Sequence, residues 1–200
     1  MTMRFFEKYL ARKSKLGLIF NAAVVILAIF IMIPQTRKAT TALMLRATIF
    51  IYQPSLLAKP IPLQADVEQW QLRTLDGDTC QFADFLGKPL IINYWASWCA
   101  PCIAEMGQFE KLYADYADDV NFLFISNEKK SDILKFQKRK KIQMPIYQAI
   151  NNYPQQLSAN TLPVTFIISP DRNILMRKSG IVQWNGKRMR NIIRQLIDKN

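Results

Sequence analysis

The sequence predicts an α/β domain whose central mixed sheet is flanked by helices, preceded by one transmembrane helix. Three observations predict this. A short apolar run, residues 90–95, ends near a Cys-x-x-Cys and is followed by apolar side chains at helical spacing. Further along, short apolar runs alternate with amphipathic stretches, which is typical of strands and helices in one α/β unit. Near the N-terminus, residues 16–33 contain no charged side chain.

Residues 16–33 form the predicted transmembrane signal anchor. As a helix they would span about 27 Å, enough to cross the apolar core of a bilayer. Residues 1–15 are a basic segment, so the positive-inside bias places them in the cytoplasm and the rest of the chain outside, on the periplasmic side of an inner membrane. A cleaved signal peptide is the alternative, although residues 31–35 offer no small-x-small cleavage site.

Residues 34–66 are expected to form an amphipathic segment and a linker. In residues 39–52 the charge of Arg46 makes a membrane crossing costly, so the segment is expected to lie on the outer membrane surface or against the domain. If it did cross, the domain would return to the cytoplasm. Pro54 ends this segment, and residues 55–64, with Pro60 and Pro62, are expected to form an extended linker. More than half of the net charge of +12 comes from residues 1–66, which favours a membrane-flanking role and argues against a nucleic-acid partner.

Residues 67–200 are predicted to form the folded domain, which begins with a β-hairpin. Asp76-Gly77-Asp78 is a strong turn signal between two short runs. Cys80 lies in the returning run and leaves an odd number of cysteines in the chain. The simplest interpretation of Cys80 is a small buried apolar side chain; an interchain disulfide or a second redox cysteine are the alternatives.

The predicted strand at 90–95 leads into Cys99, and the helical period begins after Cys102. Cys99 should therefore lie at a helix N-terminus, where unpaired N–H groups and the helix dipole stabilise a thiolate. Pro101 suits the first helical turn because it has no N–H to leave unpaired. Since Cys99 precedes the helix, we expect it to be the more exposed sulfur and the attacking nucleophile. Cys102 is then the resolving thiol that closes the disulfide.

A Cys-x-x-Cys is also found in zinc sites and as an inert buried pair. Zinc takes four ligands, usually Cys or His, and this chain has three cysteines and no histidine. A structural zinc site would need carboxylates or a partner chain. We therefore expect no metal, and no cofactor beyond a redox-active disulfide between Cys99 and Cys102.

The remaining elements complete the alternating pattern. Ser131 is the expected N-cap of the second helix, whose basic C-terminal run complements the helix dipole. The other expected elements are a strand at 121–126, a short strand at 144–147, a helical turn within 151–159, a hairpin of 164–169 with 173–178, and a final helix from Lys187.

Trp98-Cys99-Ala100-Pro101-Cys102 behind an apolar strand resembles the active-site motif of the thioredoxin superfamily. Thr161-Leu162-Pro163-Val164, where a proline opens a β-branched strand, supports the resemblance. It implies a thioredoxin fold, in which Pro163 is cis, lies against the dithiol and contacts substrate, while Leu162 faces the substrate backbone. An ordinary proline at the start of a strand is the alternative for Pro163.

The hairpin and residues 83–89 (Ala-Asp-Phe-Leu-Gly-Lys-Pro) resemble the TlpA/ResA-like branch, which adds an N-terminal β-hairpin to the thioredoxin fold. Asn93 fits that branch as well. Thioredoxins proper have a buried aspartate at the matching place, and an amide cannot replace it as a base.

The pattern Cys-x-x-Cys-x-x-Glu is frequent in the same branch, and here it ends at Glu105. Three residues after Cys102, Glu105 projects from the same helical face, so we expect it to be the acid/base for the Cys102 proton. The alternative is a first-turn glutamate stabilised by the helix dipole. Gly107 stands where the branch usually has a helix-kinking proline.

The resemblance implies a membrane-anchored, outward-facing thiol-disulfide oxidoreductase that reduces disulfides of extracytoplasmic proteins, as in cytochrome c maturation. Its implied partners are a protein disulfide substrate and a membrane electron donor that reduces the dithiol again. A disulfide-forming oxidase using the same pair in reverse is one alternative, although the Ala-Pro dipeptide resembles reductant branches more. A non-catalytic thioredoxin-like binding module is the other.

Overall fold

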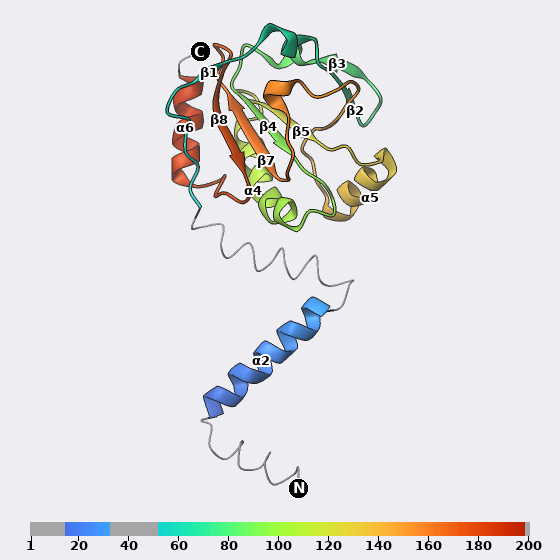
Figure 1. Ribbon diagram of the computed structural model, residues 1–200, viewed down its shortest axis with the longest axis vertical. Coiled ribbons are helices and arrows are strands. Elements are labelled where there is room, and N and C mark those ends of the chain that lie inside the picture. The colour runs from blue at the N-terminus through green and yellow to red at the C-terminus, as the bar shows by residue number, and fades with distance from the viewer. Residues whose placement is uncertain (1–14, 33–51, 199–200) are drawn as a thin grey trace. The chain divides into compact units, whose positions relative to one another are not determined.

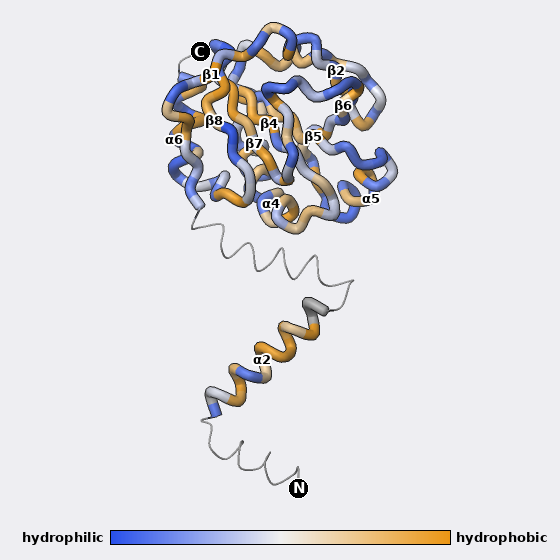
Figure 2. The backbone as a smooth tube through the Cα atoms, viewed as in Figure 1, coloured by the Kyte–Doolittle hydropathy of each residue, from blue (hydrophilic) through white to orange (hydrophobic). Residues whose placement is uncertain are grey.

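The computed structural model describes residues 15–32 and 52–198, which belong to two compact units, 1–41 and 42–200. In the first unit, helix α2 (Lys15–Met32) consists mostly of apolar residues (Figure 2). None of the helices within the described ranges has the combined length and apolarity that crossing a membrane requires. The expected segment 16–33 is thus helical as far as it is described, and its role as an anchor stays a prediction.

Two other predictions concern residues that are mostly not described. The expected basic segment 1–15 lies outside the described residues except for Lys15, and the expected amphipathic segment 39–52 does so except for Tyr52. Both stay predictions.

In the second unit, the described residues form one eight-stranded mixed sheet in the order β1-β8-β7-β4-β5-β6-β2-β3 (Figure 1). The central strand β4 runs parallel to β5 and antiparallel to β7. The strands are β1 (Ile61–Pro62), β2 (Gln71–Thr74), β3 (Thr79–Gln81), β4 (Leu90–Tyr94), β5 (Asn121–Ile125), β6 (Ile146–Ala149), β7 (Val164–Ile168) and β8 (Asn173–Ser179). The helices are α4 (Ala100–Tyr116), α5 (Lys130–Lys140) and α6 (Lys187–Ile197), with 3₁₀ turns η2 (Ala65–Gln69), η3 (Phe82–Phe85) and η4 (Gln155–Leu157).

The order of these elements confirms the thioredoxin-like α/β fold with an added hairpin. From β4 to α6 the chain alternates as expected, and the β2–β3 hairpin turns at Gly77, whose φ of 113° favours glycine. The hairpin joins the sheet through β2, which pairs antiparallel with β6. One expected cap is wrong: α5 begins one residue before Ser131, because the carbonyl of Lys129 already accepts the N–H groups of Asp132 and Ile133.

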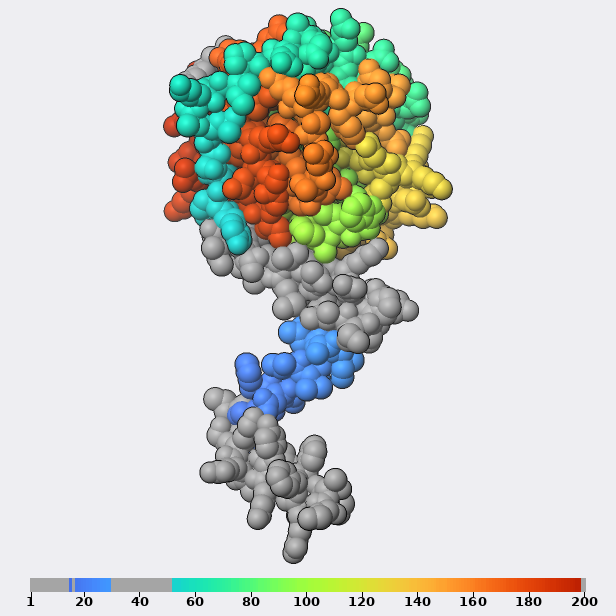
Figure 3. Space-filling model, viewed as in Figure 1, coloured from blue at the N-terminus to red at the C-terminus, as the bar shows by residue number. Residues whose placement is uncertain are grey.

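The expected linker is partly an edge strand. Ile61 and Pro62 form β1 beside β8, and the N–H of Leu57 donates to the carbonyl of Leu175 at 2.8 Å. Figure 3 shows this cyan segment running along the orange-red C-terminal part of the domain. Pro62 is compatible with this place because an edge strand does not need every N–H group for pairing.

The sheet is buried on both faces. Side chains at alternate positions of β4 belong to two different apolar clusters: Ile91 to one, and Leu90, Ile92 and Tyr94 to the other. The first cluster contains the buried apolar side chains of α5 and α6, most of those of α4, and both Cys99 and Cys102. The second contains Val67, Phe82 and Leu157 from the 3₁₀ turns. Burial on both faces explains why β4 is almost entirely apolar.

Candidate active site

The turn between β4 and α4 carries the two cysteines. Cys99 is the N-cap residue of α4, and its Sγ accepts the Cys102 N–H at 3.3 Å. Pro101 lies in the first turn of the helix, as expected. Cys99 and Cys102 are joined in a disulfide, with 5.3 Å between their Cα atoms. The strand-to-helix turn that the sequence predicts is therefore present, with a sulfur at the helix N-terminus.

The expected difference in exposure between the two sulfurs is not observed. Cys99 is 4% exposed and Cys102 is 3% exposed. Both belong to the same apolar cluster, and Leu162 packs against that cluster. The side chain that reaches solvent is Trp98, which is 58% exposed. The assignment of Cys99 as nucleophile therefore depends on its place at the N-cap and not on its exposure.

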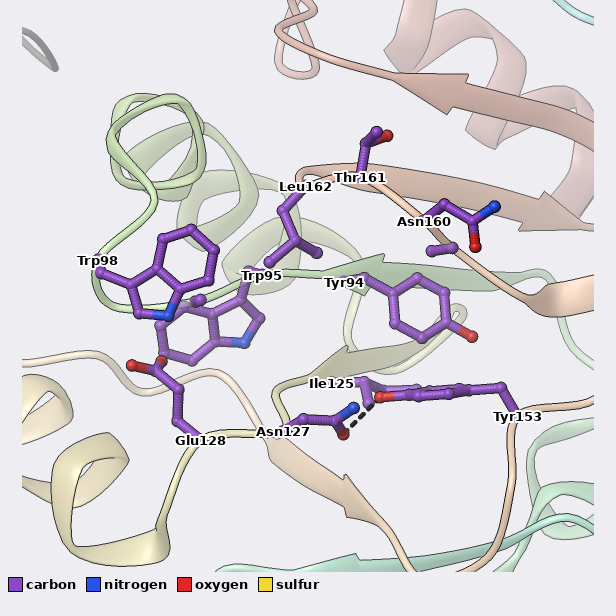
Figure 4. Close-up of a pocket in the computed structure, with 12 residues that line it drawn as sticks. Tyr94, Trp95, Trp98, Ile125, Asn127, Glu128, Tyr153, Asn160, Thr161 and Leu162 are labelled. Carbon is purple, nitrogen blue, oxygen red and sulfur yellow. Dashed lines mark hydrogen bonds between the residues drawn. The ribbon is translucent and has the colours of Figure 1, made fainter.

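The loop before β7 reaches the end of β4. The Leu162–Pro163 peptide bond is cis, and Val164, the next residue, pairs with Tyr94 at the last position of β4. Pro163 is buried, whereas Leu162 is half-buried. Leu162 lies in the same pocket as Trp98 (Figure 4). The cis bond is as the resemblance implies, and contact with a substrate stays a prediction.

Asn93 contributes a neutral buried contact. It is 4% exposed, and its Nδ2 donates to the hydroxyl of Thr165 on β7 at 2.9 Å. Neither group can give up or take a proton near neutral pH. Asn93 thus links the two central strands, and any proton acceptor for Cys102 has to be another residue.

Glu105 is the buried ionisable group of α4. It is 1% exposed, and its Oε1 accepts the backbone N–H of Val182 at 2.7 Å and the indole N–H of Trp184 at 2.8 Å. Its Oε2 has no hydrogen-bond partner within the described residues. Burial raises the pKa of Glu105 from 4.5 to about 8, and the two hydrogen bonds partly oppose that rise.

The position of Glu105 in α4 bears on the alternative interpretation of this residue. The first turn of α4 contains no acidic residue, so a glutamate held there by the helix dipole is wrong. Gly107 lies within α4, which continues unbroken to Tyr116. Glu105 is instead a largely desolvated carboxyl that can change its charge near neutral pH.

Glu128 is a site residue that the sequence analysis missed. It follows β5, and its carboxylate accepts the backbone N–H of Ser97 at 2.5 Å and the Ser97 hydroxyl at 2.7 Å. The hydroxyl of Ser126 also donates to it, at 3.3 Å. Glu128 therefore holds the segment just before Trp98 and Cys99. The available signal was topological: β4 and β5 are parallel, so polar residues after their C-terminal ends meet at one edge of the sheet.

A pocket of about 460 Å³ lies at this edge (Figure 4). Two buried donors in it, Tyr94 Oη and Trp95 Nε1, have no acceptor within the described residues. The Tyr153 hydroxyl donates to Asn127 Oδ1. The pocket is mostly aromatic and apolar, as binding pockets generally are. Its lining residues are Tyr94, Trp95, Ala96, Trp98, Ile125, Asn127, Glu128, Tyr153, Ala159, Asn160, Thr161 and Leu162.

Cys80 is half-buried in β3, a terminal strand of the sheet, whereas the disulfide follows the central strand β4. Its Sγ donates weakly to the Leu72 carbonyl at 3.7 Å. Burial raises the pKa of the Cys80 thiol, with smaller contributions from Asp84 and Asp78. A thiol held protonated in this way fits the interpretation of a small, largely apolar side chain.

Comparison with known families and proteins adds to this geometry. Residues 63–177 match the model of the AhpC/TSA family. The chain is similar to the thiol-disulfide oxidoreductase ResA of Geobacillus thermodenitrificans, with 34% identity over 112 residues, covering 54% of this chain and 62% of that protein. It is similar to the thioredoxin-like protein YneN of Bacillus subtilis, with 31% identity over 103 residues, covering 50% and 61%. The chain thus spans about three fifths of the length of these curated relatives.

A solved structure has the same fold. The thiol:disulfide interchange protein of the thioredoxin family from Chlorobium tepidum is similar with a TM-score of 0.53 and 22% identity, covering 70% of this chain and 99% of that chain. At this level of identity the similarity concerns the fold alone.

Proposed function

We propose that this chain, which belongs to the AhpC/TSA family, is a thiol-disulfide oxidoreductase. In this proposal, Cys99 and Cys102 exchange with a disulfide of a protein substrate. One observation carries the proposal: the Cys99–Cys102 disulfide lies at the N-terminus of α4, with the Cys102 N–H directed at the Cys99 sulfur. In the reduced protein the same N–H and the helix dipole would stabilise a Cys99 thiolate, the form that attacks disulfides.

The reaction begins from the reduced pair. The Cys99 thiolate attacks one sulfur of the substrate disulfide, forming a mixed disulfide and releasing the other substrate sulfur as a thiolate. Cys102 gives up its proton and attacks the Cys99 sulfur, which forms the Cys99–Cys102 disulfide and releases the second substrate thiolate. Two electrons leave the protein dithiol, the substrate disulfide gains them, and an electron donor must reduce the pair again.

Glu105 is the proposed acceptor of the Cys102 proton. The two residues lie one turn apart on the same face of α4, and both are buried. A carboxyl with a pKa of about 8 has a proton affinity close to that of a thiol, so a proton can pass between them in either direction at little cost.

We further propose a direction of electron transfer and a location for the domain. A reductase of extracytoplasmic proteins, of the cytochrome c maturation type, is the function that the resemblance implies, and the relatives named thiol-disulfide oxidoreductase support its chemistry. The uncharged segment 16–33 and the basic residues before it support an anchor with the domain outside the cytoplasm. Under this proposal, the electron donor is a membrane protein.

The exchange chemistry is tested with single-cysteine variants of the full chain in a Cys80→Ser background. With dithiothreitol as the electron source and a disulfide-containing peptide as the substrate, Cys99→Ser should reduce the peptide no faster than dithiothreitol alone. Pre-reduced Cys102→Ser, mixed with the peptide after dithiothreitol has been removed, should accumulate a mixed disulfide on Cys99, detected by mass spectrometry. Full activity of Cys99→Ser would overturn the role of Cys99, and a parent protein that reduces the peptide no faster than dithiothreitol alone would favour a non-catalytic binding module.

The direction is tested by trapping thiols in living cells with an alkylating mass tag, in the same Cys80→Ser background. Two free thiols at steady state support the reductase. A disulfide at steady state that re-forms quickly after a pulse of reductant supports the oxidase alternative, because direction is set by the reduction potential against that of the compartment.

A further inference from the structure

Trp184 is a buried side chain that the exchange chemistry does not by itself require. It lies between β8 and α6, is 0% exposed, and stacks on Phe109 of α4 with 5.2 Å between ring centroids. Its indole N–H donates to Glu105 Oε1 at 2.8 Å. Packing against Phe109 would be equally satisfied by a phenylalanine ring, so the hydrogen bond is the specific contribution of the tryptophan.

The two oxygens of Glu105 are bound unequally. Oε1 accepts from both Trp184 Nε1 and Val182 N, whereas Oε2 has no partner in the described part of the chain. A carboxyl oxygen has two lone pairs, and two N–H donors occupy both on Oε1. A proton bound to Glu105 must therefore be on Oε2.

We propose that Trp184 is a positioning residue of the proton-handling site: with the Val182 amide it saturates Oε1 of Glu105 and leaves Oε2 as the oxygen that exchanges a proton. The inference rests on the proposed function, in which Glu105 takes the proton of the Cys102 thiol. The proton leaves Cys102 Sγ, binds to Oε2, and leaves a thiolate on Cys102; when the dithiol is restored, the proton returns along the same path.

The surroundings of Glu105 make this contact measurable. Residues 180–186, which supply both donors, contain no charged side chain. Cys102 precedes Glu105 on α4, Asn93 and Thr165 on the neighbouring strands are neutral, and Arg190 of α6 pairs with Asp115 of α4. No charged side chain contributes to the pKa shift of Glu105, which reflects burial opposed by the two hydrogen bonds. Loss of one donor should therefore raise the pKa further.

The test uses Trp184→Phe, with Trp70→Phe as the matched control. Trp70 is also a buried tryptophan, but its Nε1 has no acceptor within the described residues, so the control makes the same substitution without removing a hydrogen bond. The titration of Glu105 is followed in the full-length oxidised protein through its protonated-carboxyl infrared band, assigned by its loss in Glu105→Gln. The pH dependence of peptide-disulfide reduction is measured on the same proteins.

In Trp184→Phe the Glu105 titration should move up by about one pH unit, because a hydrogen bond to a charged group is worth roughly that much. The rising part of the pH–rate profile should move by the same amount, and Trp70→Phe should leave both unchanged. An unchanged Glu105 titration in Trp184→Phe overturns the inference. A shifted titration with an unshifted rate profile supports the role of Trp184 and overturns instead the proposed acid/base role of Glu105.

A second variant covers the case in which Trp184→Phe does not fold. A tryptophan analogue with sulfur in place of the indole N–H, introduced at position 184, keeps the shape of the ring and removes only the donor. It should give the same upward shift, and an unshifted titration would overturn the inference in the same way.

Discussion

Two glutamates are linked to the segment that carries the cysteines, and they bind their partners in different ways. Glu128 is half-buried, and both of its carboxylate oxygens accept hydrogen bonds, from Ser97 and Ser126. Glu105 is 1% exposed, and only one of its oxygens accepts any within the described residues. Both oxygens of Glu128 therefore accept hydrogen bonds from neighbouring residues. Glu105 has one buried oxygen without a partner within the described residues.

The contrast shows that two acidic side chains near the same cysteine pair have different hydrogen-bonding environments. Hydrogen bonds to both oxygens hold the neighbouring residues in place. Burial with one unpaired oxygen favours the protonated form and leaves it able to exchange.

The largest effect should be a pH-dependent stability that disappears in Glu105→Gln. The pKa of Glu105 is about 8 in the folded protein, against 4.5 as the ordinary value. Between these pH values the folded state binds the proton and the unfolded state does not, so the free energy of unfolding falls as pH rises. This contribution is fully present below about pH 4.5, is lost as pH passes about 8, and amounts to on the order of 5 kcal/mol.

Denaturant unfolding of the oxidised proteins from about pH 5 to about pH 9 measures this contribution. Glu105→Gln should remove most of the slope, and Asp119→Asn, which changes an exposed carboxyl, should keep it. A slope that is the same in wild type and Glu105→Gln would mean that Glu105 does not titrate in this range.

Removal of the other carboxylate should act on stability without a change in that slope. Glu128→Ala leaves the Ser97 N–H without its acceptor and loosens the segment before Cys99, which should cost about 2 kcal/mol and slow disulfide exchange. Glu128→Gln keeps an acceptor oxygen and should lose less than half as much. Unfolding midpoints measure the loss of stability in both variants, and hydrogen exchange of the Ser97 amide measures the loosening. Equal protection of that amide in wild type and Glu128→Ala would contradict the proposed role of the Ser97–Glu128 hydrogen bond.

The smallest effect should come from Ser97→Ala. This change removes the hydroxyl bond to Glu128 at 2.7 Å and leaves the backbone N–H bond in place, so it should cost about 1 kcal/mol. In a double-mutant cycle with Glu128→Ala the two losses should not add, because both variants remove the same bond. Strict additivity would show that the hydroxyl bond contributes nothing to stability.

Local patterns predicted the central part of the fold well. The apolar run at 90–95, the cysteine pair and the helical period after it define β4 and α4, because each is determined by neighbours in the chain. The cis state of Pro163 was predicted from the resemblance, since spacing alone does not distinguish a cis proline from any other proline at the start of a strand. The attention given to Glu105 also came from a pattern of the resembling branch.

Contacts between distant residues could not be predicted in the same way. Glu128 meets Ser97 because two parallel strands end together, and Trp184 meets Glu105 across a sequence separation of 79 residues. No sequence motif predicts either contact. The pairing of residues 61–62 with β8 was missed because prolines are typical of both linkers and edge strands. Cys99 and Cys102 are both buried in a cluster against which Leu162, also remote in sequence, packs.

The two terminal strands of the sheet bear on whether another chain can add a strand to it. β1 has two residues, one of them a proline, and β3 has three. Short edges offer few free backbone groups, so another chain finds little template for adding its own strand. Under the proposed function, exchange of the mixed disulfide would then be enough to release a bound protein substrate.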